Sequence, residues 1–407
     1  MICRFCGKAD IFKFLDLGSM PPANSFLTKA ELASVKETAY PLDAFFCDHC
    51  GLVQIGYVVP PDKLFKDYIY VSSTSDMIHK HADYLAKSFK SRFGLHEHSL
   101  VVEVASNDGT VLQYFKRLGL KTLGVEPATN IAKAAVEAGI DTLNEFFNTE
   151  TARLLRSEHG PADLILGRHV FAHVPEIQSF VEGLKHLTFP HGVVAIEAPY
   201  LVDFVLNTEF DTIYHEHYSY LSIRSMSYLF NLYDMEIFDV ERFPIHGGSI
   251  VYFIGHRGAR PITDHVSSLI NEELDKGLDR ADTYQKFAER TAKIKRDLIA
   301  LLQSLKASGK SVAAYGAPAK GNTLLNYCGI TQDLVAYTVD KSPYKQNLYT
   351  PGAHLFIYPP EKLLQDQPDY VLLLAWNFAE EIMEQQREYL RRGGHFIVPI
   401  PDVKVLA

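Results

Sequence analysis

Hydrophobic and polar positions along the middle of the chain alternate between strand-like and helix-like patterns. A helical pattern from about His79 to Phe93 precedes an apolar run from Leu100 to Ala105, which is typical of a buried parallel strand. A short polar turn follows this run, and a helix begins near Thr110. Further segments continue the alternation, with strands at Lys121 to Val125, Asp163 to Leu166 and Gly192 to Glu197 and a helix near Asn130 to Ala138. These repeated units predict a doubly wound parallel sheet that binds ligands beyond the carboxyl ends of its strands.

A second, smaller α/β unit is predicted near the C-terminus. The polar, helix-forming stretch from Thr283 to Leu305 leads into a strand at Ser311 to Tyr315, a loop at Gly316 to Gly321 and a helix. Three further strands are expected near Leu334 to Val339, Tyr370 to Leu374 and His395 to Val398. We therefore expect a Rossmann-like C-terminal domain over residues 283–407, after a central domain over residues 79–282.

Composition narrows the class of protein. The chain has 407 residues, enough for two or three cores, and its 47% hydrophobic and 22% charged residues are those of an ordinary globular protein. A formal net charge of −9 disfavours non-specific binding to nucleic acid or to anionic membranes, so a small-molecule partner is expected. No apolar run reaches the roughly 18 residues of a membrane helix, and the first residues resemble no signal peptide, so we expect a cytoplasmic protein. Oligomeric state is open.

Four of the five cysteines form two matched pairs. Cys3 and Cys6 make one C-x-x-C pair, and Cys47 and Cys50 make the other. In a reducing compartment such pairs bind Zn²⁺ more often than they form disulfides, and four thiolates leave no open position on the metal. The sequence therefore predicts an N-terminal zinc-binding domain over residues 1–78, with a structural ion.

The first strand-turn-helix unit has the features of a nucleoside-cofactor site. Small and polar residues from Ala105 to Gly109 lie where backbone N–H groups and a helix N-terminus meet a ligand. Glu126 ends the next strand, a position from which a carboxylate accepts the hydroxyl protons of a ribose. Both NAD enzymes and S-adenosylmethionine (SAM) enzymes use this arrangement, although the turn lacks the G-x-G-x-x-G pattern.

A series of motifs, in order along the chain, resembles the SAM-dependent sugar C-methyltransferases that act on nucleotide-linked keto-deoxysugars. In that family the first motif usually reads E-x-G-S-N-D-G, and here it is Glu103-Val104-Ala105-Ser106-Asn107-Asp108-Gly109, with Ala105 in place of a glycine. The later motifs are Arg168 to Pro175, Glu197 to Leu201, Phe210 to His217, His246 to Ser249 and Tyr315 to Asn326. Together with the cysteine pairs they cover nearly the whole chain.

The resemblance implies SAM as the cofactor and a 4-keto-deoxyhexose linked to a nucleotide as the substrate, methylated most often at C-3. Carbon methylation next to a keto group requires a base and a donor to the enolate oxygen. By resemblance His217 is the base, Tyr214 and Glu216 orient the substrate or polarise its keto group, and His173 and Tyr70 reach the same cleft. The implied cofactor residues are Ser106, Asn107, Asp108, Gly109, Glu126, Pro127 and Phe146 or Phe147, with His169 where the family commonly has asparagine.

The C-terminal loop offers a second ligand site. Gly316, Lys320 and Asn322 lie at a strand-to-helix turn that could hold the diphosphate of the substrate through backbone N–H groups and one cation, although a tight packing turn would have the same pattern.

Three alternatives remain open for the function. His215 and His217 could bind a catalytic metal. The enzyme could be an NAD-dependent nucleotide-sugar oxidoreductase or epimerase, or the chain could be a catalytically silent zinc-containing scaffold.

Overall fold

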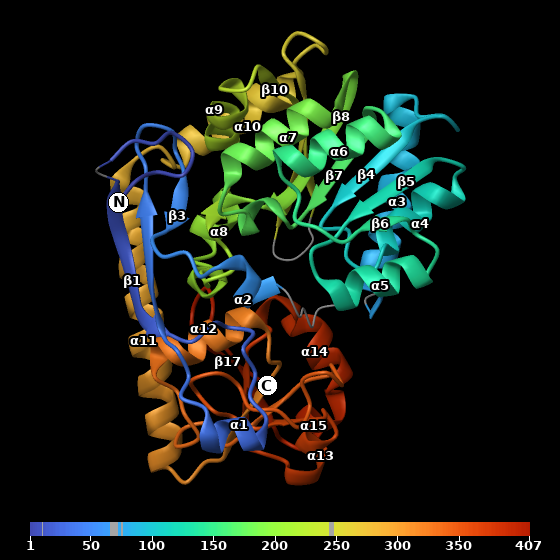
Figure 1. The fold of residues 1–407 in the computed structure, drawn as a ribbon. Coiled ribbons are helices and arrows are strands. Elements are labelled where there is room, and N and C mark those ends of the chain that lie inside the picture. The colour runs from blue at the N-terminus through green and yellow to red at the C-terminus, as the bar shows by residue number, and fades with distance from the viewer. Residues whose placement is uncertain (10, 66–71, 75, 244–247) are drawn as a thin grey trace.

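A computed structural model describes residues 1–9, 11–65, 72–74, 76–243 and 248–407, and three sheets organise this part of the chain (Figure 1). The central sheet has the order β10-β11-β8-β7-β4-β5-β6. Its parallel strands are β4 (Leu100–Val104), β5 (Lys121–Val125), β6 (Thr142–Leu143), β7 (Ala162–Arg168) and β8 (Thr188–Pro199), and its antiparallel strands are β10 (Met235–Phe243) and β11 (Ser249–His256). The predicted strands at 100–105, 121–125, 163–166 and 192–197 are therefore confirmed.

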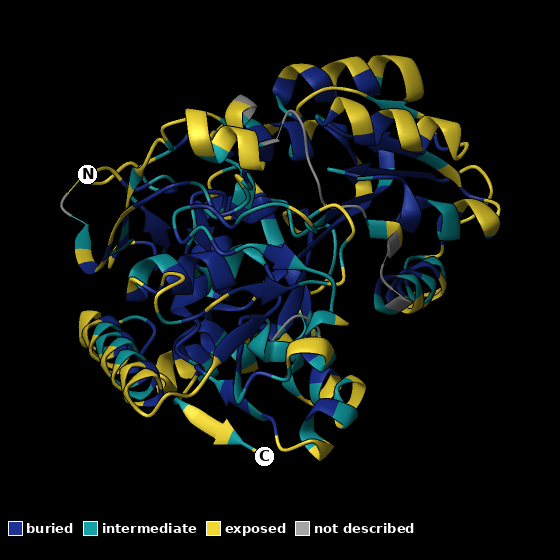
Figure 2. Cartoon of the chain, turned by 90° about the horizontal axis from the view of Figure 1, so that it is seen from below, coloured by how far each residue is buried: buried dark blue, intermediate teal, exposed yellow. Residues whose placement is uncertain are grey.

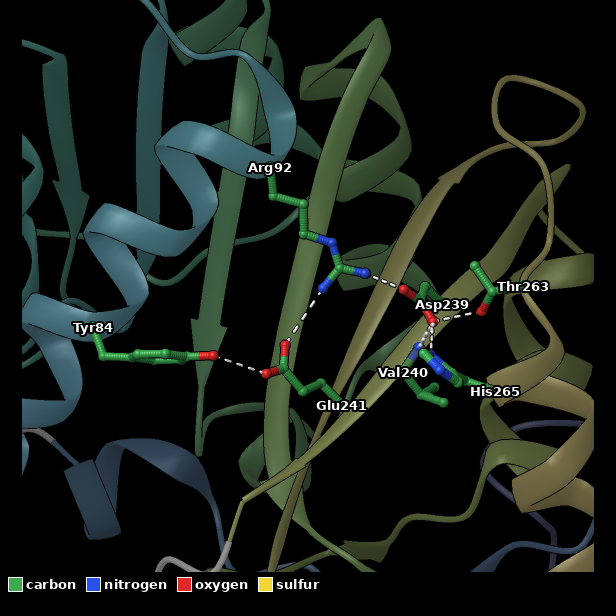
Figure 3. Close-up of polar contacts among 7 residues, drawn as sticks. All are labelled: Tyr84, Arg92, Asp239, Val240, Glu241, Thr263 and His265. Carbon is green, nitrogen blue, oxygen red and sulfur yellow. Dashed lines mark hydrogen bonds and ion pairs between the residues drawn. The ribbon is translucent and has the colours of Figure 1, made fainter.

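Helices cover both faces of the central sheet, as the alternating pattern predicted. One hydrophobic cluster joins the strands to α3 (Asp76–Phe93) and α4 (Thr110–Arg117), and the other joins them to α6 (Thr149–His159) and α7 (Ile177–Leu187). Side-chain bonds tie α3 to the edge strand β10, since Arg92 pairs with Asp239 and Tyr84 donates to Glu241 at 3.0 Å (Figure 3). Buried residues gather on the sheets, and exposed faces belong mostly to the outer helices (Figure 2).

The C-terminal sheet has the order β14-β13-β12-β15-β16-β17. Its parallel strands are β12 (Val312–Tyr315), β13 (Thr338–Val339), β14 (Ile357–Tyr358), β15 (Tyr370–Leu373) and β16 (His395–Val398), with β17 (Lys404–Leu406) antiparallel. The chain leaves β12 toward β13 and later returns to β15, so the order reverses between β12 and β15, where open α/β sheets bind ligands. The strand expected at Leu334 to Val339 is shorter than predicted, because only its last two residues pair.

The N-terminal sheet is completed by a strand from the central region. Strands β1 (Phe12–Met20), β2 (Tyr40–Phe46) and β3 (Val53–Ile55) pair in that order, and β9 (Ser219–Tyr220) then pairs with β3. The long helix α11 (Ala281–Ala307) runs beside β1 (Figure 1), and the Phe14 ring lies 5.2 Å from that of Tyr284.

The segment after β1 also contacts the C-terminal unit. Asn322 Nδ2 donates to the Ala23 carbonyl at 2.7 Å, Leu27 pairs with Tyr349, and Glu37 pairs with His354. The N-terminal unit therefore packs against both α/β units.

Shorter elements connect these parts. The helices are α1 (Lys29–Ser34), α2 (Pro61–Phe65), α5 (Thr129–Glu137), α8 (Leu201–Leu206), α9 (Ile223–Asn231), α10 (Asp264–Asp275), α12 (Ala319–Cys328), α13 (Lys362–Asp366), α14 (Ala379–Gln385) and α15 (Arg387–Arg391). The 3-10 turns are η1 (Ser72–Thr74), η2 (Phe171–His173), η3 (Phe210–Thr212) and η4 (Trp376–Phe378). None of the described helices is both long enough and apolar enough to cross a bilayer.

Candidate active site and zinc site

The four paired cysteines converge on one point. Their Sγ atoms all lie within 4.8 Å of one another, with Cys3 to Cys50 at 3.5 Å and Cys6 to Cys47 at 3.6 Å. A tetrahedral zinc ion with Zn–S bonds of about 2.3 Å separates its sulfurs by about 3.8 Å, so these residues fit Zn²⁺. Cys328 is far from this group in sequence and is buried as a free thiol. The predicted four-cysteine site is confirmed.

The candidate cofactor loop follows β4 and contains unusual backbone conformations. Ala105 and Asn107 have φ values of 55° and 51°, and His169, which follows the adjacent strand β7, has 49°. Residues other than glycine rarely adopt the left-handed region, and such strain clusters at ligand sites. The φ of residue 105 suits glycine, which explains why the related family motif has a glycine at this position.

Polar groups of the loop are bound within the protein. Glu126 accepts hydrogen bonds from the backbone N–H groups of Asn107 and Ala128, each at 2.9 Å, and burial raises its pKa. Asn107 Oδ1 and Asp108 Oδ2 accept from the backbone N–H groups of Ser72 and Ser73. The loop and Glu126 are therefore held in a fixed arrangement, with Gly109 at the start of α4.

The remaining predicted cofactor residues divide into buried and exposed groups. Phe147 is buried against Phe180, with ring centroids 5.2 Å apart, whereas Phe146 is 39% exposed and is the aromatic ring open to a ligand. Ser106 is buried, and its hydroxyl oxygen lies where a side chain on Gly124 would be. The carbonyl oxygen of Pro127 accepts a hydrogen bond from Asn144.

Glu197, at the end of β8, gathers three cationic or polar partners. Arg168 Nε donates to it at 2.8 Å, His81 Nε2 lies 3.1 Å away, and His169 Nε2 lies 3.5 Å away. Burial opposes ionisation, but Arg168, His169 and His81 together hold the pKa of Glu197 well below its usual range. His169 therefore contacts a buried carboxylate next to the cofactor loop.

A turn over residues 214–217 brings the central catalytic candidates together. The N–H of His217 donates to the Tyr214 carbonyl at 2.9 Å, so the segment does not alternate as an extended strand would. His217 Nδ1 lies 2.9 Å from the Thr212 carbonyl oxygen, and its Nε2 lies 2.8 Å from the Tyr214 hydroxyl. Because a carbonyl only accepts, Nδ1 carries the proton, and Nε2 offers its lone pair to the Tyr214 O–H.

The groups in this turn have pKa values displaced in opposite directions. Burial, with a contribution from His173, holds the pKa of His217 well below its usual value, and burial lowers that of His173 to about 4. Burial raises the pKa of Glu216 to about 7, against the effects of Asn24 and Lys345. The rings of His173 and His217 lie 4.7 Å apart. Near neutral pH the site therefore holds neutral histidines and a Glu216 carboxyl that is protonated in a large fraction of the molecules.

The N-terminal unit supports the same turn from the other side. Asn24 Nδ2 donates to both Glu216 oxygens, at 2.8 and 3.0 Å. His215 Nε2 donates to the Tyr40 carbonyl at 3.2 Å. With the ring nitrogens of His217 also engaged, His215 and His217 do not form a metal site, and among the described residues only the four cysteines make a group suited to a metal ion.

The predicted substrate loop differs in detail from the expectation. Helix α12 begins at Ala319, so Lys320 and Asn322 lie in its first turn and not in a loop. Lys320 is enclosed, with its Nζ hydrogen-bonded to Asn377 and 4.4 Å from the centre of the Trp376 ring. Gly316 has a φ of 92° and its N–H donates to the Val339 carbonyl.

A cavity opens at the edge of the C-terminal sheet formed by the carboxyl ends of its parallel strands. It has a volume of about 520 Å³ and lies beyond the carboxyl ends of β13 and β14. Amide side chains and two prolines dominate its lining, which comprises Lys341, Gln346, Pro359, Pro360, Glu361, Gln385 and Gln386.

Sequence reasoning missed several residues of the site. Asn24, Lys345 and Trp376 lie far from residue 216 in the sequence and belong to no motif with a known spacing. Glu103 and Asp211 stand inside motifs that were singled out, and burial raises their pKa values to about 8 and about 6. Tyr70, predicted to reach the cleft, lies outside the described residues.

Comparisons with known proteins cover the whole chain. Three family models match in succession, described as a zinc binding domain over residues 3–65, a methyltransferase domain over residues 77–240 and a C-methyltransferase C-terminal domain over residues 244–401. The C-methyltransferase NovU of Streptomyces niveus is 38% identical over 406 residues, which are 100% of this chain and 96% of NovU.

Two other similarities are restricted to part of the chain. The ubiquinone biosynthesis O-methyltransferase of Bartonella tribocorum is 28% identical over 97 residues, which are 24% of this chain and 39% of that protein. A solved SAM-dependent methyltransferase from Anabaena variabilis is 15% identical, with a TM-score of 0.35, and the match covers 49% of this chain and 100% of that structure.

Proposed function

The chain belongs to the family of SAM-dependent C-methyltransferases, and from this premise we propose that it methylates carbon next to the keto group of a nucleotide-linked 4-keto-deoxyhexose, at C-3. The observation that carries the proposal is the turn at residues 214–217. It combines a neutral histidine of fixed tautomer with a carboxyl of raised pKa. The NAD-dependent and silent-scaffold alternatives lack support from the full-length similarity to a C-methyltransferase.

The two displaced pKa values assign an acid and a base. His217 stays unprotonated near neutral pH and takes the substrate proton at Nε2. The Tyr214 hydroxyl, which orients the ring through this atom, must release the lone pair as the substrate C–H takes its place. Glu216, which retains its proton up to about pH 7, donates to the keto oxygen as negative charge develops there. Removing a proton and stabilising the enolate oxygen together make the adjacent carbon the nucleophile that C-methylation needs.

SAM would bind at the residues that close the carboxyl end of β4 and β5. Glu126 would hold the ribose, Asn107 and Asp108 would contact the methionine end, and Phe146 would cover the adenine. The bound cofactor supplies a methyl group on a cationic sulfonium as the electrophile. Glu103, Asp108 and Glu126 lie close enough to influence one another, and a cationic ligand beside them would favour the ionised forms that burial disfavours in Glu103 and Glu126.

The C-terminal unit would hold the nucleotide of the substrate. Helix α12 begins without a side-chain cap at the switch point beside β12, so its first N–H groups are available to a diphosphate. The cavity beyond β13 and β14 has a volume suited to a nucleoside. Lys320 would attract the diphosphate through its charge, which is enclosed beside this helix end. A Lys320→Ala protein with an unchanged KM for the sugar nucleotide would mean that Lys320 does not help to bind it.

The function is tested with purified protein, SAM and a panel of nucleotide-linked 4-keto-deoxyhexoses in deuterated water. We expect exchange of the proton on the carbon next to the keto group and a product that carries one extra methyl group on that carbon, and we expect S-adenosylhomocysteine to bind while NAD does not. His217→Asn serves as the matched inactive variant. Methyl transfer to oxygen or nitrogen, or no exchange with any sugar of the panel, would refute the proposal.

A further inference from the structure

A buried aspartate with no assigned role links the C-terminal unit to the catalytic turn. Asp211 lies in η3 and is fully buried, and its Oδ2 accepts the indole N–H of Trp376 at 2.7 Å. Trp376 belongs to the C-terminal unit, where it follows β15 at the point where the strand order reverses. This is the single tryptophan of the chain.

The residue next to Asp211 fixes the state of the candidate base. The Thr212 carbonyl accepts from His217 Nδ1 at 2.9 Å and from the Tyr220 hydroxyl at 3.3 Å. If η3 moved and this bond were lost, Nδ1 would no longer be the favoured site of the ring proton, and Nε2 could carry it instead. A histidine protonated at Nε2 has no lone pair there to accept a substrate proton.

The carboxyl group of Asp211 is buried beside the Trp376 indole and the backbone of η3. Burial raises its pKa to about 6, while Lys320, the Trp376 N–H and the backbone N–H groups of Asp211 and Thr212 favour its charged form. The Thr212 N–H and the Thr212 carbonyl belong to successive peptide units that meet at the Thr212 Cα, so a fixed η3 also fixes the direction of this carbonyl. The indole of Trp376 holds one oxygen of this carboxylate, and the Thr212 N–H donates to the Glu209 carbonyl at 3.0 Å, which closes the turn of η3.

We propose that Asp211 is a positioning residue that, anchored by Trp376, holds the Thr212 carbonyl so that His217 keeps its proton on Nδ1 and its lone pair on Nε2. This inference rests on the proposed role of His217 as the base. It makes the C-terminal unit part of the machinery for proton removal, in addition to any role in binding the nucleotide. Asp211 touches no reacting atom.

The chain offers a matched control for removing a buried aspartate charge. Asp239 on β10 is also buried and accepts from the Val240 N–H, Thr263 and His265, as well as pairing with Arg92 (Figure 3). It lies in the antiparallel part of the central sheet, where it binds none of the residues of the catalytic turn. Asp239→Asn therefore reproduces the chemical change of Asp211→Asn at a distant position.

The test compares Asp211→Asn and Trp376→Phe with Asp239→Asn in full-length, zinc-loaded protein. Two-dimensional NMR of ¹⁵N-histidine protein reports the tautomer of each ring, with the His217 signals assigned by their loss in His217→Asn. We expect Asp211→Asn and Trp376→Phe to mix the two tautomers of His217 and to lower kcat and the rate of substrate proton exchange by about tenfold, the loss of roughly one hydrogen bond. KM and the affinity for S-adenosylhomocysteine should stay within about twofold of wild type, and Asp239→Asn should change none of these quantities.

An unchanged His217 tautomer in both Asp211→Asn and Trp376→Phe would overturn the inference. Equal losses in Asp239→Asn would also overturn it, because they would show a general effect of removing a buried charge. Thermal unfolding and zinc content confirm that each variant is folded. If wild-type protein exchanges no proton with any keto-sugar nucleotide, the proposed function fails, yet the tautomer measurement still decides whether Asp211 positions His217.

Discussion

Replacing Asn24 with aspartate is expected to move the alkaline limit of activity to higher pH. Asn24 Nδ2 lies 2.8 and 3.0 Å from the two oxygens of Glu216, and this carboxyl has a pKa of about 7 because it is buried. In the proposed mechanism Glu216 must hold a proton, so wild-type kcat/KM should fall as the pH rises through about 7. Asn24→Asp places a second carboxyl where the amide donor was.

The size of the shift follows from the separation of the two groups. Two like charges about 4 Å apart at an effective dielectric constant of about 20 repel by about 4 kcal/mol, which corresponds to roughly three pKa units. The pair would titrate as a unit and keep one proton to a correspondingly higher pH. Lys345 also faces Glu216 and opposes the shift, so three units is an upper limit. Asn24→Ala removes a donor that favours the charged form without adding charge, and its shift should be about one unit in the same direction.

The assay is the pH dependence of kcat/KM for methyl transfer between pH 5 and pH 10, and the readout is the position of the alkaline limb. The order of the limb should be wild type, then Asn24→Ala, then Asn24→Asp at the highest pH. Asn231→Asp, which makes the same charge change at an exposed position, should leave the profile unmoved. A limb for Asn24→Asp that coincides with wild type, or that moves to lower pH, would refute the assignment of Glu216 as a proton donor.

Three further predictions concern the base, the zinc site and the cofactor loop. His217→Asn should lower the rates of substrate proton exchange and methyl transfer by about 10²–10⁴, with little change in S-adenosylhomocysteine affinity. Tyr214→Phe leaves Nε2 able to accept a proton and should lower these rates less. Equal losses of the two variants in the exchange assay would mean that the tyrosine itself relays the proton. Cys47→Ser should lower the zinc content and the thermal midpoint and abolish methyl transfer, because β3 of the zinc-binding unit pairs with β9 just after the turn at residues 214–217. Cys328→Ala is the control. Methyl transfer retained by zinc-free protein would contradict this prediction. Ala105→Gly should leave the free energy of unfolding nearly unchanged, because relief of about 1 kcal/mol of strain at a φ of 55° offsets the added freedom of the unfolded chain. Its control is Ala134→Gly on the exposed face of α5, which should lower the free energy of unfolding by about 0.5–1 kcal/mol in denaturant unfolding.

Local patterns allowed much of the architecture to be predicted. The runs that become β4, β5, β7 and β8 are apolar because both faces of a parallel sheet are covered, and such runs are visible in the sequence without tertiary information. The cysteine pairs were equally clear, because C-x-x-C spacing is a local geometric requirement of the metal.

The contacts that give the site its chemistry are not local. Asn24 and Glu216 are 192 residues apart, and Asp211 and Trp376 are 165 apart, so no periodicity relates them. The alternation of side chains along an extended strand does not hold at residues 214–217 either. The hydrogen bond from the His217 N–H to the Tyr214 carbonyl makes a turn that brings these two side chains to one side. Burial then sets the pKa values, and burial depends on all three units at once.

The pairing of β3 with β9 has a consequence for how the chain folds during synthesis. Residues 53–55 leave the ribosome more than a hundred residues before their partners at 219–220, and Leu27 must wait still longer for Tyr349. Until then the N-terminal sheet presents an unpaired edge, which is a site for association with other chains. Early zinc binding would keep this part compact, but its final structure forms only when the C-terminal residues arrive, so maturation of the enzyme is a late and cooperative event.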